Sequence, residues 1–359
     1  MSDRAAGRVL WLPAVVFWGV LAAPLLGCNR KPHLVPAGPD STAAIPSDST
    51  ALYVQIARDA WGSSDDNGKA ADLTARLILN RMRADKDQTL GTAAREFVDS
   101  LGMGAEVSGR DPAAVNLFSR SDPTGGSWPF LFWRDAGIVH YQPLDASGLH
   151  LNGLAVEPSE PGKAQRVATL FMGSGANGQQ PFAFVWTRPP NAQSWRLTQS
   201  LGTDSLGRSG NARIVEGSPD GTVLEARTYT VPRGFDECAA CPHVYQVRRL
   251  RWDTPGLVTA SLTAEHTPYS TFVEFVTALG AGDRGKAQQL VAEGSLLGTA
   301  EGYGWSSAKS RWRLAPGMAA NSPELLIFRG AQDAYRVHFA PRGDEWVITA
   351  FEPSSRSLE

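Results

Sequence analysis

The stretch from Val167 to Thr187 reads VATLFMGSGANGQQPFAFVWT and decides how the middle of the chain folds. Its two ends are apolar runs rich in Val, Phe and Trp, and the segment Gly173–Gly178 between them is rich in glycine. That segment matches GxGxxG, but a dinucleotide site needs a helix next, whose N-terminus holds the pyrophosphate. Here Pro181 and a second apolar run follow, so we predict two strands joined by a hairpin loop.

Similar short runs, rich in β-branched and aromatic residues, recur from about Val115 to Ala264. Gly, Pro, Asn and Asp separate them, and Asp220-Gly221 is typical of a hairpin turn. Many strands without intervening helices predict an antiparallel sandwich or a propeller-like body. The lack of a clean internal repeat counts against the propeller-like option. The predicted strands are Trp128–Trp133, Ile138–Gln142, Leu149–Val156, Val167–Met172, Phe182–Thr187, Trp195–Gln199, Thr222–Thr230, Val244–Trp252 and Leu257–Leu262.

The segment Ala51–Leu101, which precedes this region, has helical periodicity. Its residues Ala94, Phe97, Val98 and Leu101 follow the spacing i, i+3, i+4, i+7, which places them on one helix face. We therefore predict amphipathic helices that pack on the sheets that follow.

Helices return from Pro268 onward. Thr271 and Glu274 fit a capping box, and Asp283 can cap a second helix. Alternating apolar residues then predict more strands. These C-terminal strands are Trp312–Leu314, Leu325–Phe328, Tyr335–Phe339 and Trp346–Phe351.

The whole pattern predicts an α+β fold with N-terminal helices, an antiparallel β-rich middle and a C-terminal α+β domain. Hydrophobic residues make up 42% of the 359 residues, enough to bury a core. We divide the chain into residues 1–27, 28–50, 51–265 and 266–359.

Residues 1–27 have the features of a secretory signal peptide. Arg4 and Arg8 precede the uncharged run Val9–Leu26, and Leu25-Leu26-Gly27-Cys28 follows. This ending resembles the lipobox of bacterial lipoproteins. The resemblance implies cleavage before Cys28, which would carry acyl chains that hold the protein at a membrane. The alternative is an uncleaved membrane helix, which two prolines within the run disfavour.

The resemblance also implies a location. Asn29 follows the cysteine, whereas an Asp there retains enteric lipoproteins at the inner membrane, so we expect the outer membrane, facing the periplasm. Residues 28–50 hold four prolines among Ser, Thr and Asp without an apolar period, which predicts a disordered tether.

The C-terminal region 266–359 resembles the nuclear-transport-factor-2-like cone fold. The resemblance rests on Phe275-Val276-x-Ala278-Leu279-x-x-Gly282-Asp283 and on the strands that end in Trp346-x-Ile348. It implies a curved sheet wrapped on helices with a pocket between them, and it implies no particular activity. Four residues are candidates for lining that pocket: Tyr303, Trp305, Arg336 and His338.

Cys238 and Cys241 are the pair of cysteines left after lipidation of Cys28. In an exported protein we expect them to form a structural disulfide. A thioredoxin-like role needs the first cysteine at a helix N-terminus, but a strand pattern follows. A metal site would use both cysteines and His243, with Asp236 or His266 as the fourth ligand.

Catalytic motifs are weak or missing. Gly68-Lys69 lacks the correctly spaced glycine and the Ser/Thr of a phosphate loop. Ser306-x-x-Lys309 has the spacing of a serine acyl-transferase but lacks the companion KTG motif. We therefore assign no catalytic residue, no metal and no cofactor.

Charge and motifs together favour a function in binding. The formal net charge of −2 provides no basic footprint for nucleic acid. We predict a membrane-anchored, non-catalytic binding or interaction module, with an envelope protein or a cell-wall component as its partner. The alternative is a periplasmic enzyme or small-ligand carrier that uses the C-terminal pocket or the cysteine pair.

Overall fold

The computed structural model describes most of the chain after residue 49. The described ranges are 50–61, 67–101, 104–120, 126–158, 162–175, 178–238, 240–307, 311–331 and 333–355. The predicted signal peptide, Cys28 and nearly all of the predicted tether lie outside them. In these ranges, the structure contains no helix with the length and hydropathy needed to span a bilayer.

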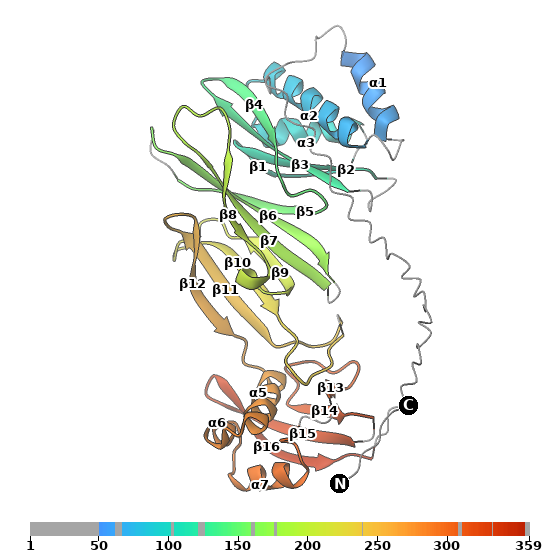
Figure 1. Ribbon diagram of the computed structural model, residues 1–359, viewed down its shortest axis with the longest axis vertical. Coiled ribbons are helices and arrows are strands. Elements are labelled where there is room, and N and C mark those ends of the chain that lie inside the picture. Colours follow the sequence, from blue (N-terminus) through green and yellow to red (C-terminus); the bar gives the residue numbers. More distant parts are fainter. Residues whose placement is uncertain are drawn as a thin grey trace, which may run out of the picture. The chain divides into compact units, whose positions relative to one another are not determined.

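Three N-terminal helices cover one face of a first four-stranded antiparallel sheet (Figure 1). Helix α2 buries Ala71, Ala75, Ile78 and Met82, whose spacing puts them on the face toward the sheet. The elements are α1 (Thr50–Trp61), α2 (Asn67–Ala84), α3 (Leu90–Leu101), β1 (Gly104–Gly109), β2 (Ala113–Phe118), β3 (Ser127–Asp135) and β4 (Ile138–Pro143).

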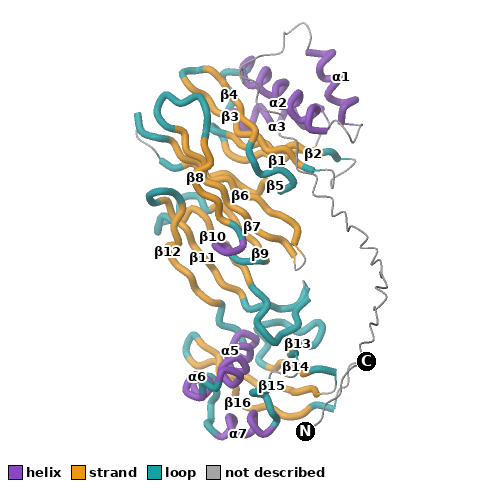
Figure 2. Tube along the Cα trace, viewed as in Figure 1, coloured by secondary structure: helices purple, strands orange, loops and turns teal. Residues whose placement is uncertain are grey.

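Two further four-stranded antiparallel sheets follow, and in each of them sequential strands are neighbours (Figure 2). The second sheet holds β5 (His150–Val156), β6 (Gln165–Gly175), β7 (Gly178–Arg188) and β8 (Arg196–Leu201). The third holds β9 (Ser209–Ile214), β10 (Thr222–Tyr229), β11 (Tyr245–Trp252) and β12 (Leu257–Ala264), with the short helix α4 (Thr203–Leu206) before it.

The second sheet is buried on both faces. On β6, Val167 and Phe171 pack against the first sheet, whereas Ala168 and Leu170 pack against the third. A strand buried on both faces lacks the usual alternation with polar residues, which explains why Val167–Met172 is apolar except for the buried Thr169.

The outer face of the third sheet is polar. Arg213 on β9, Glu225 on β10 and Arg249 on β11 lie side by side across the strands, and Glu225 pairs with both arginines. A polar outer face ends a stack of sheets, because it offers no apolar surface to another layer.

The predicted α+β class with an antiparallel β-rich middle is confirmed.

The C-terminal domain packs three helices on one face of a fourth antiparallel sheet. Its core is aromatic, and most of its buried residues come from the first helix and from the inward positions of the strands. The elements are α5 (Pro268–Ala281), α6 (Arg284–Gln289), α7 (Ser295–Gly302), β13 (Trp312–Leu314), β14 (Glu324–Arg329), β15 (Asp333–Arg342) and β16 (Glu345–Pro353).

The two predicted helix caps in this domain have different outcomes. The capping box of Thr271 with Glu274 is wrong, because Thr267 caps α5 and forms the box with Ser270. Pro268 fits there, since the first helical position needs no N–H donor. Asp283 caps α6 as predicted, and its carboxylate accepts from the Lys286 N–H at 3.0 Å.

The core between the second and third sheets gives a matched test of this layering. Leu224→Ala removes a fully buried side chain and should lower the free energy of unfolding by about 2–5 kcal/mol, because it leaves a cavity. Leu262→Ala, on the edge strand β12, removes a side chain that is 49% exposed and should change it by less than about 0.5 kcal/mol. Urea unfolding of both variants measures the difference; equal losses would contradict the layering.

Candidate functional site: a groove beside the β10–β11 connection

The connection between β10 and β11 leaves the third sheet and pairs with the C-terminal domain. Phe235 forms an isolated parallel bridge with Trp312 on β13. The Asp236 N–H donates to the Trp312 carbonyl at 2.7 Å, and the Trp312 N–H donates to the Gly234 carbonyl at 2.9 Å. This segment therefore extends the edge of the C-terminal sheet.

The next residues form a disulfide between Cys238 and Cys241, which confirms the disulfide predicted from the sequence. The Cα atoms are 5.0 Å apart, and the Cys241 N–H donates to the Cys238 carbonyl at 2.9 Å, so the disulfide closes a tight turn. No helix follows the turn, and the chain continues into β11 instead. Both sulfurs are bonded to each other, so neither is a thiolate ligand. Across the described ranges, no three His, Cys, Asp or Glu side chains are grouped as metal ligands would be.

Glu237, directly before the disulfide, is held inside a buried network. Its carboxylate accepts from the Tyr269 O–H at 2.6 Å and from His243 Nδ1–H at 2.7 Å. The side chains of Glu237 and His243 are each only 2% exposed. Burial and the neighbouring Glu237 charge raise the pKa of Tyr269, so its phenol keeps its proton. The network joins the β10–β11 connection to helix α5.

The imidazole of His243 stacks on Tyr229, with ring centroids 3.5 Å apart and an interplanar angle of 8°. Tyr245 meets both rings edge-on. Burial raises the pKa of Tyr229. His243 Nε2 is buried and has no hydrogen-bond partner among the residues that the structure describes. An unpaired buried polar atom costs about 1–3 kcal/mol, so this atom is suited to a partner from outside the chain.

These residues border a groove of about 990 Å³, which we call the junction groove. One wall is the connection, residues 236–238 and 240–243, and the other is formed by residues 313–321. The sheet contributes Arg227, Tyr245 and Glu265. The Arg227 guanidinium lies 3.4 Å over the Tyr245 ring and pairs with Glu265. A cavity of this size, with apolar walls and a few convergent polar groups, has the composition of a ligand site.

The carboxylates of the groove are already engaged. Glu265 pairs with Arg227, Glu237 with His243 and Tyr269, and Asp236 lies 3.8 Å from Arg311.

Arg313 is different. Its guanidinium carbon lies over the Phe328 ring, 5.6 Å from the ring centroid, and within the part of the chain that the structure describes it has no carboxylate partner.

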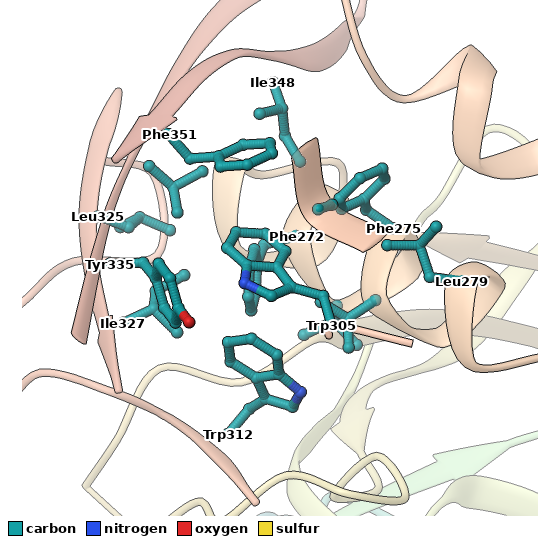
Figure 3. Packing of buried hydrophobic residues seen from close by; sticks show 14 of the residues in the cluster. Phe272, Phe275, Leu279, Trp305, Trp312, Leu325, Ile327, Tyr335, Ile348 and Phe351 are labelled. Atoms are coloured by element: carbon teal, nitrogen blue, oxygen red, sulfur yellow. The ribbon is translucent and has the colours of Figure 1, made fainter. Parts of the chain in front are cut away.

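The four residues predicted to line a pocket are not brought together. Trp305 is 1% exposed and lies 4.5 Å from Phe351 between ring centroids, inside the aromatic core (Figure 3). Tyr303 packs against the same core. The predicted pocket is therefore filled by these side chains.

Arg336 and His338 lie on the other face of β15. Strand alternation turns Tyr335, Val337 and Phe339 inward, so the two polar residues face outward, where both approach Glu324. The pocket prediction for Tyr303, Trp305, Arg336 and His338 is corrected on this ground.

Sequence reasoning considered His243 only as a metal ligand and did not select Glu237, Tyr229 or Arg313. The one available signal was position, since Glu237 precedes the first cysteine and His243 follows the second by two residues. Nothing in the sequence linked them to Tyr269, which is 32 residues from Glu237.

Comparisons with known proteins identify no family for this chain. No family model matches the chain, and no curated protein matches it. Among solved structures, it is similar to a mutant of the Aleuria aurantia lectin in complex with Fucα1-6GlcNAc, at 10% identity and a TM-score of 0.23. The match covers 70% of this chain and 61% of the lectin chain. A likeness this weak supports no conclusion about fold or function.

The disulfide gives a prediction about stability. The double variant Cys238→Ser, Cys241→Ser should fold but lose about 2 kcal/mol of unfolding free energy when both proteins are measured without reductant. The loss is modest because the disulfide closes a short loop, so removing it increases the chain entropy of the unfolded state only a little. Urea unfolding measures the loss, and reductant should produce the same loss in the wild type while leaving the variant unchanged. A wild type insensitive to reductant would contradict the prediction.

Proposed function

We propose that the chain is a lipid-anchored lipoprotein of the cell envelope whose folded part is a non-catalytic binding module. The junction groove is its binding site. The observation that carries this proposal is the groove itself, which combines about 990 Å³ of space with a buried histidine that has an unpartnered nitrogen.

The anchor rests on the lipobox-like sequence Leu25-Leu26-Gly27-Cys28 and the preceding apolar run. Acyl chains on Cys28 would hold the protein at a membrane, and the absence of Asp at position 29 favours the outer membrane. The folded part would face the periplasm, where an envelope protein or a cell-wall component is its partner.

The chemistry of the groove favours binding over catalysis. Nucleophilic catalysis pairs a nucleophile with a base such as histidine. Among the described groove residues, the cysteines are joined as a disulfide and the Thr267 hydroxyl caps helix α5, so no nucleophile is paired with His243. The neighbours of the imidazole are instead Glu237 and two tyrosines, which fix its position.

A small-ligand carrier is the second candidate. The volume of the groove lies at the upper end of the range for small-molecule sites, about 300–1,000 Å³. A carrier would use the junction groove and not the interior of the C-terminal domain, which is filled by Trp305 and its neighbours.

Native mass spectrometry of the full chain, extracted from membranes in a mild detergent without reductant, tests the proposal. We expect a chain that begins at Cys28, carries acyl chains, and weighs two hydrogens less than its reduced form. We also expect a retained ligand that Ala319→Trp removes, because this exposed residue lines the groove and an indole there would occupy it.

The matched control is Ala260→Trp, which places the same side chain on an exposed position of β12 that does not line the groove. It should retain the ligand. An uncleaved chain or an unmodified Cys28 would refute the anchor. A chain that retains no ligand, or equal retention by both variants, would refute the groove as the binding site.

A further inference from the structure

We propose that the junction groove recognises an anionic group, a carboxylate or a phosphate, held between Arg313 and His243 Nε2. This inference rests on the proposed function, because it names the chemistry that the same groove would bind. Two independent features lead to it: a cation without a counter-ion and a buried nitrogen without a partner.

Arg313 supplies the cation. It lies on β13, where inward neighbours Trp312 and Leu314 are buried, so alternation turns Arg313 to the opposite face, along the groove. It is partly buried, and its guanidinium rests on the Phe328 ring. This contact leaves the N–H donors of the guanidinium for another group, and carboxylate and phosphate oxygens match their fork.

The parallel bridge brings this arginine to the connection. Trp312 pairs with Phe235, so the next residue on β13, Arg313, lies beside the segment that contains Asp236 and Glu237. Asp236 is the nearest acid in register, but it is an exposed residue that already approaches Arg311. Among the described residues that line the groove, no carboxylate therefore neutralises Arg313.

His243 supplies the second donor. Its Nδ1–H is committed to the Glu237 carboxylate, which leaves Nε2 for the ligand. A ring that carries protons on both nitrogens can donate through Nε2 to the ligand while Nδ1 donates to Glu237. The stack on Tyr229 holds the ring, so the direction of this donor is fixed before the ligand arrives.

The charges then balance. Arg227 with Glu265 and Arg311 with Asp236 are neutral pairs. The Glu237 carboxylate is already engaged by His243 and Tyr269, and the ligand anion neutralises Arg313. A neutral ligand would leave the Arg313 charge uncompensated in a partly closed site, so the groove discriminates in favour of an anion.

The remaining walls suit an apolar body attached to the anion. Pro242, Ala315, Met318 and Ala319 line the groove beside the Tyr245 ring. Benzoate, phenyl phosphate and benzamide are therefore suitable probes, since they share one ring and differ in carboxylate, phosphate or neutral amide.

Isothermal titration calorimetry of the full chain in a non-ionic detergent compares the three probes. We expect benzoate or phenyl phosphate to bind at least tenfold more tightly than benzamide, and the stronger of the two identifies the anion as carboxylate or phosphate. Arg313→Gln should weaken anion binding at least tenfold, because it removes the charge-assisted hydrogen bonds. Arg313→Lys, which keeps the positive charge, should bind the anion more tightly than Arg313→Gln but less tightly than the wild type.

Arg336→Gln is the control, since this arginine lies on β15, pairs with Glu324 and does not line the groove, and it should bind like the wild type. Benzamide binding as tightly as both anions, undetectable binding of both anions, or unchanged anion binding by Arg313→Gln would overturn the inference. If native mass spectrometry still shows a ligand that Ala319→Trp removes, only the anion inference fails. If no ligand is retained either, the groove fails as a binding site.

Discussion

A single buried carboxylate, Glu237, fixes the geometry on which the site depends. Both of its oxygens accept hydrogen bonds, one from Tyr269 at the start of α5 and one from His243 beside β11. A carboxylate removed from water without such partners would cost several kcal/mol, so these contacts hold the connection in one place. The disulfide follows directly and restricts the turn. The groove wall, the imidazole and the edge that pairs with β13 are all positioned by this short segment.

The stacked sheets provide the rigid support beneath it. The second sheet is buried between the other two, and the third presents a polar face of paired arginines and glutamates outward. Tyr229 and Tyr245 stand on that outer face at the ends of β10 and β11, where the connection begins and ends. The residues that border the groove therefore come from the rigid sheet and from the β10–β11 connection, which is bonded to the C-terminal domain. In many proteins, loops held by a rigid scaffold carry the functional residues in this way.

Much of the fold followed from local pattern, whereas most of the site did not. Strands such as Val167–Met172 were predictable because short, mostly apolar runs rich in β-branched and aromatic residues are typical of buried strands. Strand β9 was missed, since only Ala212 and Ile214 on it are inward and apolar, and Gly, Ser and Asn fill much of the rest. The Cys238–Cys241 disulfide was predictable because these cysteines are the pair left after lipidation of Cys28 in a chain expected to be exported. The Glu237–Tyr269 contact and the lack of a partner for Arg313 depend on long-range packing, which single-sequence pattern does not contain.

The most direct test of the central claim, that Glu237 locks the connection to the C-terminal domain, is differential scanning calorimetry of Glu237→Ala beside the wild type. Removing the carboxylate leaves the Tyr269 hydroxyl and His243 Nδ1 buried without partners, a loss of about 3–5 kcal/mol. We expect one transition in the wild type and, in the variant, a separate transition at lower temperature for the C-terminal domain. A variant that melts at the wild-type temperature in one transition would contradict it.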